Sequence, residues 1–388
     1  MSFRNYFFVV SPNNHTPQPR WYMLIYYTLV VLTLIAMMLY GYDNGKIKFY
    51  YMSIIVVFFV FFVGLRWKSD ADYLPYLEMY SELPTLSGLS IDVISDLYGE
   101  PGYLSFTSLL KTLGFKFYLV SFFFAVSSIL IKTYVSLKLS LQPYLTLCMY
   151  FCLHFITIEF IQIRWAVATS LLLLGLYFQY KRKLWKTVLL FLIASVFHYF
   201  SAIFFIVVLL IEIRSFRLFS ALLLLMACGG ILLQSSSFEA IAQSDSSLYA
   251  VQRMVRYLSE DISNLGIYSY LKLGMYLVLC YILRLVNPQC VKEGNRRNRF
   301  LLKASFSSIS LTLFCSFIPV LHHRATVVAD FLSIILIINM LDSIKKTGIA
   351  RIICYTLTGL LLAWYVMDVF ISTRSGVITE YRSWLTVV

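Results

Sequence analysis

Charged side chains beside or inside apolar stretches are the residues of this chain that could carry out chemistry. A charge in a membrane is costly and is usually kept for a function or neutralised by a partner. Such residues, with their aromatic neighbours, occur in short groups: Arg66, Lys68, Asp70, Asp72, Tyr73 and Tyr76; Glu159 and Arg164; His198; Arg253 and Arg256; and His322, His323 and Arg324. Arginines suit a phosphate-bearing ligand, because guanidinium is always charged and binds phosphate oxygens in pairs. A carboxylate or histidine nearby could accept a hydroxyl proton.

Several of these residues also have a purely structural explanation. Arg164 could pair with Glu159, and Arg324 with Asp330, as salt bridges inside a helix bundle. His198 could be a buried core histidine. Contact with water or with the membrane interface would explain the others: Arg253, Arg256, Tyr73 and Tyr76.

No nucleotide or metal motif accompanies these residues. The sequence contains neither G-x-x-x-x-G-K-[ST] nor G-x-G-x-x-G, which argues against nucleotide binding. Asp70 and Asp72 form only a D-x-D pair, a weak metal signal. The 7 cysteines lack C-x-x-C spacing and lie mostly in apolar stretches, where they serve as small core residues. We therefore expect no metal site and no cofactor.

The elements that position these residues must be membrane helices. Of all residues 60% are hydrophobic and 13% are charged, a balance that no water-soluble surface allows. Spanning the hydrocarbon takes about 20 apolar residues. The windows that qualify are residues 21–40, 49–65, 116–134, 143–160, 165–180, 218–234, 267–286, 301–320, 325–341 and 352–371. We predict an all-α polytopic integral membrane protein with a single transmembrane domain over residues 1–388.

One further apolar stretch, residues 184–213, is long for one span and short for two. Basic residues lie at both of its ends, and the positive-inside rule places both ends in the cytosol. We therefore predict a broken or re-entrant helix pair that turns back near His198. A break of this kind is tolerated only inside protein or beside a cavity.

Counting the pair as two crossings gives about 12 transmembrane crossings, with both termini outside. The inner side then holds basic groups at residues 46–48, 132–138, 181–186, 214–217, 284–303 and 345–351. Two longer outer (periplasmic) loops cover residues 66–102 and 235–266, and the C-terminal tail from Ser372 is a short outer extension. The net charge of +13 reflects topology and contact with membrane lipids, and no nucleic acid is expected. The candidate residues all lie toward the outer side, which favours a lipid-carried phosphate substrate.

Several short motifs, in this order, resemble the EpsG-like branch of the bacterial O-antigen and exopolysaccharide polymerases (Wzy). The motifs are Arg66-Trp67-Lys68-Ser69-Asp70-Ala71-Asp72-Tyr73-Leu74-Pro75-Tyr76, Glu100-Pro101-Gly102-Tyr103, Arg164-Trp165-Ala166-Val167-Ala168, Phe197-His198 and Arg324. Asp72 and Tyr73 match the family's Gly-x-Asp-Tyr element, with Asp70 standing where glycine is usual. Arg164, His198 and Arg324 match without adjustment.

The resemblance implies a metal-independent glycosyltransferase of the bacterial inner membrane that polymerises undecaprenyl-pyrophosphate-linked oligosaccharide repeats on the periplasmic face. It also implies a chain-length regulator as a partner. We expect catalytic roles for Asp72, Arg164, His198 and Arg324, with Asp72 or His198 as the base and Asp72 our choice. Substrate-binding roles are expected for Arg66, Asp70, Tyr73, Tyr76, Glu100, Glu159, Arg253, Arg256, His322 and His323.

Two other classes of protein compete with this interpretation. An O-antigen ligase uses the same donor with another acceptor, and sequence alone does not separate acceptors. A lipid-linked oligosaccharide flippase or transporter would place polar residues along a path through both leaflets and would often show inverted repeats. Here the charges gather toward one side and no repeat is evident.

Overall fold

The computed structural model describes residues 24–40, 44–97, 99–233, 267–291, 295–344 and 348–387. Within these ranges the regular structure is helical, with only two isolated β-bridges. Among the described residues, six helical segments are long and apolar enough to cross a membrane: α2 (Gly45–Gly64), α6 (Phe117–Leu139), α7 with the π-helix after it (Pro143–Ile161), α15 with its 3₁₀ end (Arg296–Phe317), α16 (Pro319–Ser343) and α17 (Gly348–Arg374). The chain is therefore a polytopic membrane protein, as predicted.

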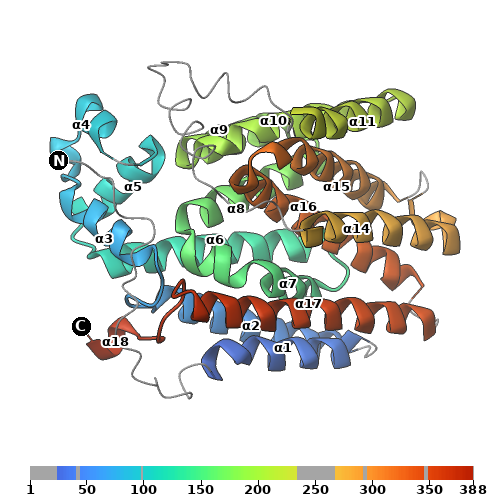
Figure 1. Ribbon diagram of the computed structural model, residues 1–388, viewed down its shortest axis with the longest axis horizontal. Coiled ribbons are helices and arrows are strands. Elements are labelled where there is room, and N and C mark those ends of the chain that lie inside the picture. The colour runs from blue at the N-terminus through green and yellow to red at the C-terminus, as the bar shows by residue number, and fades with distance from the viewer. Residues whose placement is uncertain are drawn as a thin grey trace.

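Six further helices of the described residues complete the bundle. They are α1 (Leu24–Tyr40), α8 (Ile163–Tyr180), α9 (Leu184–Phe197), α10 (Phe205–Glu212), α11 (Phe216–Leu233) and α14 (Ile267–Val286). The long helices run roughly parallel, along the horizontal direction of Figure 1. The segment from α7 through its π-helix and α16 are almost entirely buried, whereas α2 and α17 expose much of their apolar surface. The first two therefore form the centre, and the exposed apolar faces suit contact with lipid.

One end of the bundle collects the loops that were predicted to be cytosolic. Lys48 Nζ donates to Gln142 Oε1 at 3.1 Å, and Gln142 Nε2 donates to Asp342 Oδ1 at 2.6 Å. Arg296 Nη2 donates to the carbonyl of Tyr180 at 2.8 Å. The first two bonds bring together the start of α2, the α6–α7 connection and the end of α16, and the third joins the end of α8 to the start of α15, which packs against α16. The predicted inner loops thus lie at a common end, while the count of 12 crossings stays a prediction.

The stretch after the α8–α9 connection breaks at the predicted residue. α9 ends at Phe197, His198 has extended backbone angles, and a 3₁₀ helix (Tyr199–Phe204) leads into α10. Arg182, before α9, pairs with Glu212, the last residue of α10, at 2.9 Å. The chain therefore returns to the end from which it started, as expected of a pair that turns back near His198.

The first long loop, residues 66–102, is folded. It contains α3 (Tyr73–Glu82), a short 3₁₀ turn (Leu86–Gly88) and α4 (Ile91–Asp96), and it leads into α5 (Pro101–Thr112). These helices lie at the left end of the bundle in Figure 1. They enclose a small core of their own, in which Tyr73, Met79 and Leu104 pack against Phe117 and Ile163 from α6 and α8. The second predicted outer loop, residues 235–266, lies outside the described residues.

The boundary between α15 and α16 corrects the predicted window 301–320. α15 ends at Phe314, and α16 begins at Pro319, so His322, His323 and Arg324 belong to the first turns of α16 rather than following a helix. The sequence did not reveal this break, because Ile318–Val320 is apolar and was assigned to the transmembrane span. Proline at the first position of a helix is favoured, since that position needs no backbone donor.

Two lysines counted among the inner loops lie inside helices instead. Lys132 is fully buried within α6. Lys303 lies inside α15, where its Nζ donates to the carbonyls of Ile211 and Ile213 at 3.1 and 2.5 Å. The topology prediction assigned each basic residue to the nearest loop in the sequence. It was wrong for these two, because a lysine inside a helix can be neutralised by polar groups of neighbouring helices.

The C-terminal strap, residues 376–387, is more than an extension. It returns along residues 65–71, where Trp67 N donates to Arg382 O at 2.8 Å and Thr379 N donates to Ser69 O at 3.0 Å. Isolated β-bridges join Arg66 to Ser383 and Asp70 to Ile378. The strap therefore fixes the backbone of the loop that carries Asp70 and Asp72.

Candidate active site

The loop after α2 places two aspartates in different surroundings. Arg66 Nε donates to Asp70 Oδ2 at 2.8 Å, and both side chains are buried. Asp70 Oδ1 accepts the backbone N–H of Asp72 at 3.1 Å. Burial raises the pKa of Asp70, and the Arg66 guanidinium opposes that rise. Asp70 thus stabilises the turn that positions Asp72, and both of its carboxylate oxygens already accept hydrogen bonds from within the protein.

Asp72 is the partly buried carboxylate around which the arginines gather. Burial raises the pKa of Asp72 to about 6, and the neighbouring Asp70 carboxyl adds to the rise. The guanidinium groups of Arg164, Arg66 and Arg324 lie close enough to oppose it. The structure therefore brings together residues from the loop after α2, the start of α8 and the start of α16. A carboxylate with this pKa is half protonated near pH 6 and can accept a proton at neutral pH.

Arg164, the second residue of α8, is held by aromatic and acidic side chains of the folded outer loop. Its Nη1 donates to Glu100 Oε2 at 2.5 Å, and its Nε donates to Tyr76 Oη at 3.3 Å. Its guanidinium lies over the rings of Tyr76 and Tyr103, 5.3 and 5.6 Å from their centroids. These cation–π and ion-pair contacts hold the arginine in place.

The motif Glu100-Pro101-Gly102 positions this arginine and the helix break together. Glu100 precedes α5, and Pro101 is its first residue, where proline is favoured. A Cβ at Gly102 would lie 2.9 Å from the backbone carbon of Val196. Only glycine therefore lets α5 approach the end of α9, two residues before His198.

His198 lies next to the start of α8. Its ring meets that of Trp165 edge to face, with centroids 5.0 Å apart. The side chain is buried, and its backbone N–H closes the last turn of α9 on Ala194 O at 2.8 Å. Since Trp165 follows Arg164 directly, His198 and Arg164 approach the same end of α8.

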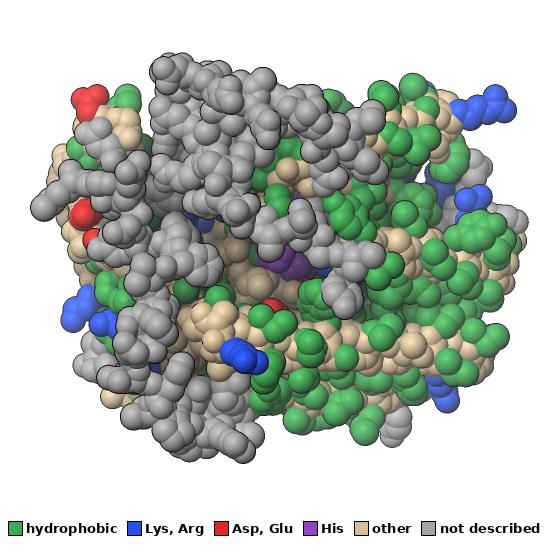
Figure 2. Space-filling view, in the orientation of Figure 1, with side chains coloured by type: hydrophobic (Ala, Val, Ile, Leu, Met, Phe, Trp, Pro, Cys, Tyr) green, Lys and Arg blue, Asp and Glu red, His purple; other side chains and the backbone are tan. Residues whose placement is uncertain are grey.

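A second charged cluster surrounds the first turns of α16. His323 lies within electrostatic range of His322, Arg324, Lys272 and His154. His322 Nδ1 contacts the carbonyl of Thr312 at 3.0 Å. Figure 2 shows histidine, basic and acidic side chains close together in a hollow, with hydrophobic side chains predominating to its right. Because Arg324 is near both Asp72 and His323, the two clusters are continuous.

The second cluster continues into the bundle at Asp330. Asp330 Oδ2 lies 2.7 Å from both His154 Nε2 and Lys272 Nζ. Within the described residues, His154 of α7 and Lys272 of α14 bind the Asp330 carboxylate, and not Arg324, the partner that the structural alternative expected. Sequence reasoning missed His154 and Lys272, although a charge inside an apolar window implies a partner in another helix.

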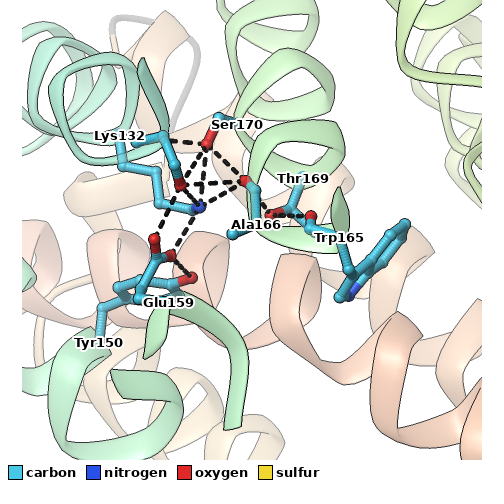
Figure 3. A network of polar contacts seen from close by, with 8 residues as sticks. Lys132, Tyr150, Glu159, Trp165, Ala166, Thr169 and Ser170 are labelled. Atoms are coloured by element: carbon cyan, nitrogen blue, oxygen red, sulfur yellow. Dashed lines mark hydrogen bonds and ion pairs between the residues drawn. The ribbon is translucent and has the colours of Figure 1, made fainter. Parts of the chain in front are cut away.

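Glu159 does not pair with Arg164, contrary to the structural alternative weighed from the sequence. It is buried in the π-helix after α7, where Oε1 lies 2.7 Å from Lys132 Nζ. Tyr150 and Ser128 donate to its two carboxylate oxygens at 2.8 and 2.7 Å. Figure 3 shows this network around Lys132. Both oxygens are therefore occupied from within the protein.

The remaining predicted residues divide into two groups. Tyr73 is fully buried, and its ring packs against those of Trp67 and Phe117. Arg253 and Arg256 lie outside the described residues. Among the residues that the structure describes, no group of three or more His, Cys, Asp or Glu side chains could hold a metal ion.

Comparison with known proteins assigns the family. No curated protein and no solved structure matches the chain. The model of the EpsG family matches residues 49–383, a range that includes Asp72, Arg164, His198 and Arg324. The matched range covers most of the chain and every motif on which the resemblance was based. The chain therefore belongs to the EpsG family of membrane polymerases for exopolysaccharide or O-antigen.

Proposed function

We propose that this protein polymerises undecaprenyl-pyrophosphate-linked oligosaccharide repeats on the periplasmic face of the bacterial inner membrane. The single observation that carries the proposal is the position of Asp72, a carboxylate of raised pKa with Arg66, Arg164 and Arg324 around it. A glycosyl transfer from a pyrophosphate needs a group that accepts the proton of the acceptor hydroxyl and positive charge that stabilises the leaving pyrophosphate. The carboxylate can supply the first and the guanidinium groups the second.

The proposed reaction follows from these two roles. The acceptor hydroxyl oxygen attacks the anomeric carbon of the donor sugar, and the carbon–oxygen bond to the pyrophosphate breaks. Asp72 takes the hydroxyl proton. Arg164 and Arg324 bind the oxygens that gain negative charge on the departing lipid pyrophosphate. His198 holds the sugar or its phosphate by hydrogen bonds. Because arginines supply the positive charge, we expect no requirement for a metal ion.

The remaining residues fit supporting roles. Arg66 and Asp70 shape the turn before Asp72, and Glu100 and Tyr76 orient Arg164. His322 and His323 lie at the same charged region as Arg324, where they could bind the pyrophosphate or the sugar. For Arg253 and Arg256 the substrate-binding role stays a prediction. A chain-length regulator and membrane lipids are the partners we propose.

The proposed orientation is testable by cysteine labelling. The basic loops at one end of the bundle belong in the cytosol, so residues 66–102 belong outside. A single cysteine at Ser87 in a cysteine-free background is expected to react with an impermeant thiol reagent in cells whose outer membrane is permeabilised. A cysteine at Ser246, in the second predicted outer loop, should react likewise, and one at Asn44 should react only after lysis. Protection of both outer positions would put the site on the wrong side.

The C-terminal strap gives a second prediction. Deleting residues 376–388 removes the backbone bonds that hold residues 65–71, so we expect chain extension to fall by about tenfold to a hundredfold, the usual cost of a misplaced catalytic group. The measurement is the rate of polymer formation by equal amounts of membrane-inserted protein. Deleting only residues 385–388, beyond the bond from Trp384 to Leu65, is the matched control and should keep activity. Wild-type rates for the longer deletion would contradict this role of the strap.

The function itself is tested by deleting the gene and separating the surface polysaccharide on a gel. We expect a product that carries a single repeat, because a polymerase acts after the first repeat is made. An O-antigen ligase would instead leave no polysaccharide attached. A flippase would trap lipid-linked intermediates inside the cell.

A further inference from the structure

The backbone that carries Arg164 is irregular. A π-helix (Phe155–Ile161) follows α7, Gln162 has backbone angles outside the helical range, and α8 begins at Ile163. Arg164 is therefore the third residue after a π-helical segment. π-Helical segments are rare and are frequently found at functional sites. Side-chain contacts must fix the register in which α8 presents this arginine.

Lys132 contacts the chain on both sides of Arg164. Before it, Lys132 Nζ lies 2.7 Å from Oε1 of Glu159, in the π-helix. After it, the same Nζ donates to the carbonyl of Ala166 at 2.8 Å and to Ser170 Oγ at 2.9 Å, both in α8. Figure 3 shows these contacts converging on one ammonium group. A single side chain from α6 thus ties the π-helix to the first turns of α8.

The network is closed to solvent. The side chains of Lys132 and Glu159 are 0% and 1% exposed, so neither is available to a substrate. Stability alone is a weak reason for such a pair, since replacing a buried ion pair by apolar residues is often neutral or stabilising. A role in geometry explains the pair better than a role in binding.

We propose that Lys132 and Glu159 form a positioning pair that sets where Arg164 lies relative to Glu100 and Asp72. The inference rests on the proposed function, because it concerns the arginine that binds the leaving pyrophosphate. It replaces the substrate-binding role expected for Glu159 with a structural one that acts through Arg164. The effect should appear in turnover, since displacing a reacting group by about 1 Å can cost a hundredfold.

The test is a double-mutant cycle in purified protein with lipid-linked repeats. Lys132→Met is expected to lower kcat at least tenfold in the wild-type background and less than twofold in an Arg164→Lys background. The loss disappears there because both changes remove the same function. Lys303→Met is the matched control, as Lys303 also lies inside a helix and donates to two backbone carbonyls. Any loss that it causes should be the same factor in both backgrounds.

Three results would overturn the inference. Equal fold-losses for Lys132→Met in both backgrounds would show a general structural role, and a wild-type kcat would show no role. Lys132→Met leaves the buried Glu159 carboxylate unpaired, which can prevent the variant protein from accumulating. In that case the double variant Lys132→Met/Glu159→Met, which removes both charges, takes the place of Lys132→Met in the cycle. A wild-type kcat for that pair is the third contradictory result. Failure of the proposed function looks different, because the wild-type protein itself would then extend no chain.

Discussion

Replacing Arg164 by alanine is expected to lower the rate of chain extension by about a hundredfold or more. The variant leaves the charge that develops on the departing pyrophosphate without its donor, and removal of one such donor costs about a hundredfold to a thousandfold. Arg324→Ala should have an effect of the same order. The measurement is the polymer formed per mole of protein, with the amount in the membrane determined in parallel.

Arg164→Ala also leaves the buried Glu100 carboxylate without its ion-pair partner, which costs stability. Pairing it with Glu100→Gln removes that buried charge and is the control for loss of protein. Lysine keeps the charge and loses the paired hydrogen bonds, so Arg164→Lys and Arg324→Lys should recover only part of the rate. Wild-type rates for both lysine variants would disprove specific phosphate binding by these residues.

Asp72→Asn is expected to cost about a hundredfold or more in turnover. Asparagine keeps the shape of the side chain and removes its ability to take a proton, and a positioned base contributes about a hundredfold to ten-thousandfold. The base must be deprotonated, and burial raises the pKa of Asp72 to about 6. Wild-type turnover should therefore fall as the pH drops below about 6, and the residual activity of Asp72→Asn should lack this dependence.

Two comparisons identify the base. Asp70→Asn removes the neighbouring carboxylate that helps to raise the pKa of Asp72, so the pH midpoint should move to lower values while Asp72 remains. His198→Gln should weaken binding of the sugar or phosphate without removing the acidic limb. If Asp72→Asn keeps near-normal turnover and His198→Gln is inactive, the base is His198.

The helical fold followed from the sequence because each apolar window is a local property. The break at His198 was also predictable, since basic residues at both ends of residues 184–213 required the chain to turn back. The boundary at Pro319 was missed because apolar residues on both sides conceal a short turn. Composition within a window identifies a span more reliably than it identifies the end of one.

The long-range pairs of the site could not be read from one sequence. Asp330 meets His154 and Lys272 across three helices, and Lys132 meets Glu159 rather than an aqueous loop. A charged residue inside an apolar helix indicates that it has a partner, but the sequence does not indicate which residue that partner is. The predicted topology placed Asp72, Arg164 and Arg324 on the same side of the membrane, and the family's motifs linked them to one activity. The structure gives them common surroundings.

The most direct test of the proposed function uses the purified protein in liposomes with undecaprenyl-pyrophosphate-linked repeats as the only sugar substrate. We expect a ladder of products longer than one repeat, with one undecaprenyl pyrophosphate released for each bond formed. The Asp72→Asn protein, at equal amount, should give almost none. The proposal is contradicted if the wild-type protein forms no bond between repeats, whether it moves them across the bilayer unchanged or transfers them only to a different acceptor when one is supplied.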